Sequence, residues 1–290
     1  MGYFTDRHLG ARPRTADEID EPLRRGIVGL LRTRANDGSF GLEYPEHCYD
    51  GRGPIGTDLN ALRDALAALH LYNFLDNNAA QLTTLEVLDL IEFAYEKVAA
   101  PIQRSFHPFF EHYHLSFAQA EGRAAFRAEI NRIFDRNGIA FELKETGHIE
   151  RIAPEGLREA LTQAVFRTGD APLDEFLEKA RSKFLTPNPA IRKESIEALW
   201  DAWERLKTIE PGKDKRESTA NLLDKASAQR EFREVLETEA RQLTDVGNNF
   251  MIRHTEVTKI RIADDEHVDF LFHRMFALIR LLLKKSNRGG

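Results

Sequence analysis

Residues 252–261 bring together three permanent cations and one histidine among few acidic residues. An arginine can hold a phosphate through two parallel hydrogen bonds, and an adjacent histidine can move a proton near neutral pH. Arg253 and His254 could therefore support metal-free RNA cleavage, in which a 2′-hydroxyl attacks the adjacent phosphate while the protein positions groups and stabilises charge. The structural alternative is that Arg253 pairs with Glu256 or Asp245, and that His254 caps the end of the preceding helix.

Residues 106–117 form the densest aromatic stretch of the chain and contain three histidines. One functional interpretation is a base-stacking or metal-binding element that uses His107, Glu111, His112 and His114. The spacing lacks the paired i, i+4 histidines of a helical zinc site. We therefore interpret the stretch as an aromatic plug between helices, and we predict neither a metal site nor a cofactor.

Familiar catalytic signatures are missing from the sequence. It has no phosphate loop ending in Gly-Lys-Ser/Thr, no Gly-x-Ser-x-Gly elbow, no dinucleotide fingerprint and no His-Glu-x-x-His. Nucleotide hydrolysis and serine hydrolysis are therefore disfavoured. The single cysteine, Cys48, cannot form an internal disulfide or a multi-thiolate metal site, which favours a reducing compartment.

Length and charge limit the possible functions further. The 290 residues can bury a substantial core in one large domain or two of ordinary size. With 41 basic and 47 acidic residues the net charge is −6, so any nucleic-acid site must be local. The sequence shows neither a signal peptide nor an apolar run near the ~20 residues of a membrane span. We expect a cytoplasmic protein that does not contact membranes.

Apolar periodicity predicts a mainly α fold. Helical spacing covers residues 17–35, 58–74, 83–99, 121–137, 155–166, 173–184, 191–208, 226–246 and 266–284. The last two helices flank the segment that contains Arg253. Residues 36–58, rich in glycine and proline, are predicted to form a long irregular loop. Alternating apolar residues and a Thr-Gly turn predict one β-hairpin over 139–152, which must pack on neighbouring helices.

Two details of the C-terminal half bear on function. Trp200 and Trp203 lie on the apolar face of their helix and are interpreted as core residues. The polar run 210–217 is interpreted as a solvated loop, in which Lys215 and its basic neighbours could also contact phosphate.

The sequence resembles a known family in both halves. Three segments of the C-terminal half carry the first resemblance: 198–208, Gly-Asn-Asn-Phe-Met-Ile-Arg-His at 247–254, and 267–276. They are similar to the HEPN-type helical domains of bacterial abortive-infection proteins. The N-terminal half resembles the AbiJ N-terminal domain. That second resemblance is carried by Phe-Thr-Asp-Arg-His at 4–8, Arg12-Pro13, the first helix to Leu31, and Ile-Ala-Phe-Glu-Leu at 139–143 with its hairpin partner.

The resemblance implies an antiphage, toxin-like protein. Its expected domains are 1–153, AbiJ-like and containing the hairpin, and 154–290, a HEPN-like helical bundle. HEPN domains dimerise and cut RNA, often tRNA, without metal, leaving cyclic phosphate ends. Their motif is an arginine, a polar residue and, four to six residues later, a histidine.

Only the first part of that motif is present, as Arg253 and His254. The second histidine is replaced by Thr258, Lys259 or Ile260, and His267 is too distant.

Two functions therefore remain open. In the first, the protein is an abortive-infection endoribonuclease in which His254 transfers the proton and Lys259 or Arg261 stabilises charge. In the second, the nuclease is degenerate and the domain binds RNA or a protein partner in a regulatory role. Asn248 and Asn249 position RNA in either case. The expected partners are RNA, a second copy in a homodimer, and a phage-derived trigger or a neutralising protein.

Overall fold

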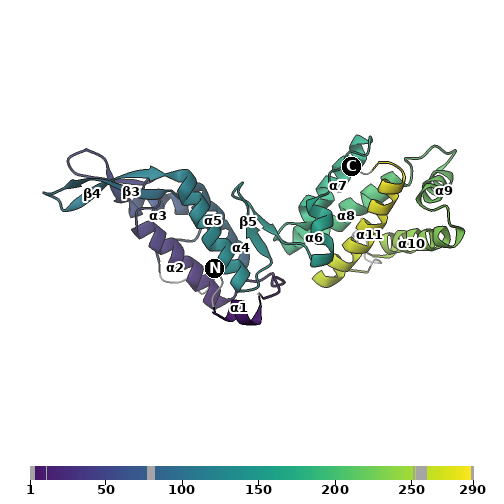
Figure 1. The fold of residues 1–290 in the computed structure, drawn as a ribbon, viewed down its shortest axis with the longest axis horizontal. Coiled ribbons are helices and arrows are strands. Elements are labelled where there is room, and N and C mark those ends of the chain that lie inside the picture. The colour runs from purple at the N-terminus through teal and green to yellow at the C-terminus, as the bar shows by residue number, and fades with distance from the viewer. Residues whose placement is uncertain (1–3, 11, 77–81, 251, 253–259, 289–290) are drawn as a thin grey trace. The chain divides into compact units, whose positions relative to one another are not determined.

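The computed structural model describes residues 4–10, 12–76, 82–250, 252 and 260–288. These residues are mainly helical and include three two-stranded antiparallel sheets, which confirms the predicted mainly α fold class. The chain divides into two compact units, Met1–Ile152 and Ala153–Gly290 (Figure 1). Each unit has a hydrophobic core of its own.

Unit 1 combines helices with three hairpins. Its helices are α1 (Phe4–Leu9), α2 (Glu21–Asn36), α3 (Leu59–Ala68), α4 (Thr84–Lys97) and α5 (Gln119–Arg136). Its strands are β1 (Pro45–His47), β2 (Pro54–Thr57), β3 (Ala100–His107), β4 (His112–Ala118), β5 (Phe141–Leu143) and β6 (Ile149–Arg151). Each strand pairs with its neighbour in the chain, as β1–β2, β3–β4 and β5–β6.

Helix α4 shows how the sequence sets an element boundary. The Thr83 side chain accepts a hydrogen bond from the backbone N–H of Glu86, and the Glu86 carboxylate accepts one from the backbone N–H of Thr83. This reciprocal capping box satisfies donors that the first helical turn leaves unpaired. Leu90, Ile91 and most other apolar residues of the helix then lie in the core, whereas Leu85 in the first turn is exposed. Thr83 is therefore the N-cap of α4.

The predicted hairpin at 139–152 is confirmed as β5–β6. Phe141 pairs with Arg151 and Leu143 with Ile149, and the apolar members of these pairs are buried. Asn131 of α5 fastens the hairpin, because its side chain donates to the carbonyl of Leu143 and accepts from the N–H of the same residue. This strand pair packs on a helix, as the sequence predicts.

Two predictions for unit 1 are wrong. Residues 36–58 are not irregular throughout, because they contain the β1–β2 hairpin. Residues 106–117 are not an aromatic plug, because most of them belong to the β3–β4 hairpin. The exposed fraction of Phe109 is 82%, and Phe106 and Tyr113 are also exposed. Strands β1 and β2 are short, and β3 and β4 lack a strict alternation of buried and exposed residues, so side-chain spacing does not reveal their pairing.

Unit 2 is a helical bundle. Its helices are α6 (Glu155–Thr162), α7 (Ala171–Phe184), α8 (Pro189–Leu206), α9 (Lys215–Ala226), α10 (Arg230–Asn249) and α11 (Asp265–Lys285). Trp200 and Trp203 of α8 are fully buried in its core, as predicted. The predicted loop at 210–217 is shorter than expected, because Asp214 caps α9 by accepting from the N–H of Glu217. No helix in the described part of the chain combines the length and apolarity needed to cross a membrane.

Candidate functional site

The predicted catalytic residues fall between the last two long helices. Helix α10 ends at Asn249 and α11 begins at Asp265. Arg253, His254 and Lys259 lie outside the described residues.

Both ends of that connection are described. Phe250 and Ile260 form a parallel bridge, and the N–H of Ile260 donates to the carbonyl of Asn249 at 3.0 Å. The chain leaving α10 therefore lies beside the chain that approaches α11. Arg261, which follows the bridge, is exposed. Three predicted positioning residues, Asn248, Asn249 and Arg261, thus gather near the end of α10.

Asn248 lines a cavity of about 270 Å³. The other lining residues come from α8 and its C-cap, from α9 and from α10: Trp200, Glu204, Lys207, Lys215, Thr244 and Gly247. Two lysines approach one carboxylate here, since Lys207 Nζ lies 2.5 Å from Glu204 Oε1 and Lys215 binds the other oxygen. Burial raises the pKa of Glu204, but the hydrogen bonds from the two lysines outweigh it and lower this pKa overall. Two cations and one anion leave the wall net positive, so it could hold a phosphate.

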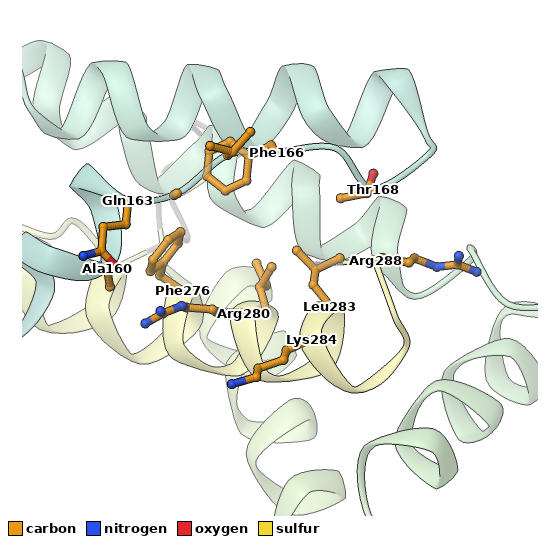
Figure 2. A pocket seen from close by; sticks show the side chains of 12 residues that line it. Ala160, Gln163, Phe166, Thr168, Phe276, Arg280, Leu283, Lys284 and Arg288 are labelled. Carbon is orange, nitrogen blue, oxygen red and sulfur yellow. The ribbon is translucent and has the colours of Figure 1, made fainter. Parts of the chain in front are cut away.

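A second cavity in unit 2 has an apolar floor and a basic rim. It has a volume of about 250 Å³ and lies between the chain after α6 and helix α11 (Figure 2). Phe166 and Phe276 meet edge to face on its floor, with ring centroids 6.5 Å apart. Arg280 and Lys284 extend from α11 toward the same side, whereas Arg288 points away from them (Figure 2). Arg288 pairs with Glu210, but no ion pair of Arg280 or Lys284 exists within the described residues.

A third group of reactive side chains lies in unit 1, where the tips of two hairpins meet. Cys48 and Asp50 belong to the turn between β1 and β2, and His107 and His114 belong to β3 and β4. Each residue offers one potential ligand atom, and these four atoms all lie within 4.8 Å of one another. The contact between the hairpins is made by β2 and β4.

Hydrogen bonds hold the turn in this position. The N–H of Cys48 donates to the carbonyl of Gly53, and the Asp50 carboxylate accepts from the N–H of Arg52. Asp50 Oδ2 lies 2.8 Å from Nε2 of His107. The other nitrogen of that ring, Nδ1, lies 3.4 Å from the backbone N–H of Phe110.

The protonation states of the turn follow from its contacts. Burial raises the pKa of the Cys48 thiol, and its hydrogen bond to Asp50 raises it further. The same hydrogen bond, together with the backbone N–H of Arg52, lowers the pKa of Asp50 to about 2. Without an ion, Cys48 is therefore a neutral thiol that donates to an ionised carboxylate at neutral pH.

His114 is the least satisfied member of the group. Its exposed fraction is 7%, and neither ring nitrogen has a hydrogen-bond partner in the described structure. Nε2 of the neighbouring His112 is likewise buried without a partner. Buried polar atoms are normally hydrogen-bonded, so two such histidines side by side require an explanation.

Sequence reasoning singled out the histidines but missed this cluster. Cys48 and Asp50 lie more than fifty residues before His107, so no local spacing joins them. One signal was present: His112 and His114 are two residues apart, which puts both on one face of a strand. That signal is readable only once residues 106–117 are known to form strands.

The fold and these sites together define a mainly α protein of two units. Unit 1 carries a Cys/Asp/His cluster between hairpins, and unit 2 carries basic cavities near the ends of its long helices. Comparison with known families gives the identification: residues 2–167 match the family described as AbiJ N-terminal domain 4. The chain belongs to this family, and the membership indicates an abortive-infection defence protein.

The match confirms the AbiJ part of the resemblance, while the HEPN part stays a prediction. It covers unit 1 and continues through α6. No curated protein and no solved structure matches the chain.

Proposed function

We propose that the protein is an RNA-directed effector of abortive infection, and that unit 2 is a metal-independent endoribonuclease. The observation that supports this best is the cavity at the end of α10, where Asn248 meets Lys207 and Lys215. A polar amide beside a net positive wall suits a phosphodiester. Arg253 and His254 follow Asn248 within six residues of the chain.

The proposed reaction needs no group from outside the protein. His254 accepts the proton of a ribose 2′-hydroxyl, and the oxygen attacks the adjacent phosphorus. The bond from phosphorus to the 5′-oxygen breaks, His254 returns a proton to that oxygen, and the products are a 2′,3′-cyclic phosphate and a 5′-hydroxyl. Arg253, with Lys259 or Arg261, stabilises the negative charge that develops on the phosphate. RNA, including tRNA, is the proposed substrate, and a homodimer is the proposed assembly.

The second candidate function is RNA binding without cleavage. It is favoured by the cavity of Figure 2, which lies apart from the motif residues in the chain. A base could stack on the partly exposed Phe166 while Arg280 and Lys284 bind the flanking phosphates. Arg280 and Lys284 are exposed cations four residues apart with no acidic partner in the described structure, so they are suited to an anionic ligand.

Induced expression in bacteria, followed by sequencing of new RNA 5′ ends, separates these functions. We expect wild type to cut RNA and arrest growth. Arg253→Ala should lose at least ~100-fold of the cleavage rate, because it removes stabilisation of the transition state. The same variant, purified, should still bind RNA.

A charge-reversal pair tests the binding cavity. Arg280→Glu with Lys284→Glu should weaken RNA binding and lower the slope of log affinity against log salt by about one unit for each phosphate that is no longer bound. Lys285→Glu is the matched control, because Lys285 is an exposed cation of the same helix outside the cavity.

Cuts at the same RNA positions by Arg253→Ala would exclude the proposed nuclease. Binding without any cleavage, abolished in the double variant alone, would establish the second function.

A further inference from the structure

We propose that unit 1 contains a zinc site formed by Cys48, Asp50, His107 and His114. The four candidate ligand atoms already lie within 4.8 Å of one another. On a tetrahedral zinc ion with bonds of about 2.0–2.3 Å, ligand atoms stand about 3.3–3.8 Å apart. Side-chain adjustments of about an ångström therefore bring the four atoms into a coordination shell.

The unsatisfied state of His114 points to a ligand. An imidazole that is more than nine-tenths buried has lost its water, yet neither nitrogen has found a protein partner in the described structure. A metal bond to one of the two nitrogens supplies an interaction that the protein does not, which explains why a polar ring is buried beside a thiol and a carboxylate. A purely apolar packing role would not favour a histidine at this position.

The donor set selects the type of ion. One thiolate sulfur, two imidazole nitrogens and one carboxylate oxygen suit zinc, which accepts all three donor types in a tetrahedral site. Magnesium and calcium prefer oxygen ligands and do not suit a thiolate. Four protein ligands also leave no coordination position open for a substrate, so the site is structural.

The site would fasten two segments that are distant in the chain. Cys48 and Asp50 come from the β1–β2 turn, whereas His107 and His114 come from the β3–β4 hairpin. The turn approaches the second hairpin closely at Gly53, where an added Cβ would lie 3.7 Å from Nδ1 of His114. Because the two hairpins meet here, one ion would lock both tips together.

Binding changes the protons of the ligands. The Cys48 thiol gives its proton to solvent and becomes a thiolate. An ion on Nε2 of His107 moves the ring proton to Nδ1, which breaks the long contact to the N–H of Phe110. Asp50 already carries its charge and can turn from His107 to the ion.

Cobalt titration of the whole purified chain tests this site. Stripped of metal and titrated with Co²⁺, wild type should bind one ion and show a sulfur-to-cobalt charge-transfer band, which zinc removes by displacement. Cys48 is the only cysteine, so this band reports one residue. Cys48→Ser should lose the band, and both it and His114→Asn should lose at least ~100-fold in affinity, more than typically follows loss of an outer-shell partner. His47→Asn, at an exposed histidine of β1, should bind as wild type does.

A second measurement needs no variant. Zinc that binds only the folded chain should raise the melting temperature measured by circular dichroism, and the same concentration of magnesium should not. Absence of stoichiometric cobalt binding, an unchanged band in Cys48→Ser, or an unchanged melting temperature with zinc would each overturn the proposal. The result is independent of RNA cleavage, since Arg253→Ala keeps all four ligands.

Discussion

At the scale of single residues, the core of unit 2 depends on a contact that only glycine permits. Gly247 of α10 lies against Trp200, and a Cβ at this position would stand 2.1 Å from Nε1 of the indole. That nitrogen also donates to the carbonyl of Leu243 at 3.0 Å, so the ring cannot easily move aside. The glycine therefore lets a tryptophan pack directly on a helix backbone.

Replacing Gly247 by alanine should destabilise unit 2 by about 1–3 kcal/mol, because overpacking outweighs the better helix propensity of alanine. Urea unfolding followed by tryptophan fluorescence measures this loss. Gly26→Ala is the matched control, since Gly26 also lies within a helix but has no atom within 4 Å of an added Cβ. That control should raise the stability of unit 1 by about 0.5–1 kcal/mol, which circular dichroism measures because both tryptophans lie in unit 2. Equal effects of the two substitutions would contradict the packing argument.

At the scale of elements, Asp170 connects the start of α7 to the end of α8. Its carboxylate caps α7 by accepting from the N–H of Leu173 at 3.0 Å. It also binds Arg205 through both oxygens, at 3.0 and 2.6 Å. The hydrogen bond from Arg205 is the main cause that lowers the pKa of Asp170, although burial opposes this shift. One side chain thus begins one helix and holds the next.

Because of this lowered pKa, the contribution of Asp170 to stability depends on pH in a defined direction. Because the pKa of Asp170 is lower in the folded state, its contribution is complete above the unfolded pKa of about 3.9 and is lost as pH falls through the folded pKa. Asp170→Asn should lower stability by about 1 kcal/mol at pH 7, since it keeps the cap but loses the ion pair with a partly exposed arginine. The difference from wild type should shrink at more acidic pH. Denaturant unfolding at several pH values checks this, and a constant difference would argue against the ion pair.

At the scale of the whole molecule, the two cores involve separate sets of residues. The core of unit 1 includes Ile27, Ile91 and Phe126, whereas that of unit 2 includes Trp200 and Phe272. Both tryptophans of the chain lie in unit 2, so their fluorescence reports on that unit alone. Circular dichroism reports on the helices of both units.

We therefore expect thermal unfolding to depart from a single two-state transition. Gly247→Ala should lower the midpoint temperature measured by fluorescence. Gly26→Ala should raise a midpoint temperature that circular dichroism detects and fluorescence does not. Comparing the two probes on the same samples checks this expectation. If either substitution moved both transitions equally, the units would unfold as one cooperative body.

Much of this molecule follows from the sequence alone. Helix periodicity, the cap at Thr83 and the alternation around Phe141 are local patterns, and each depends on residues only a few positions apart. They were sufficient for the fold class, most helices and the β5–β6 hairpin. The AbiJ resemblance was also readable from short segments.

Only the tertiary structure brought Cys48 and Asp50 to His107 and His114. Strands β1 and β2 have only three and four residues, and the longer β3 and β4 show no strict alternation of buried and exposed residues, so the sequence predicted a loop and a plug where two hairpins meet. Which hairpin tips meet is decided by backbone pairing and packing between segments far apart in the chain. A local spacing pattern cannot encode which hairpin tips meet, because each hairpin makes these contacts only when the other is present.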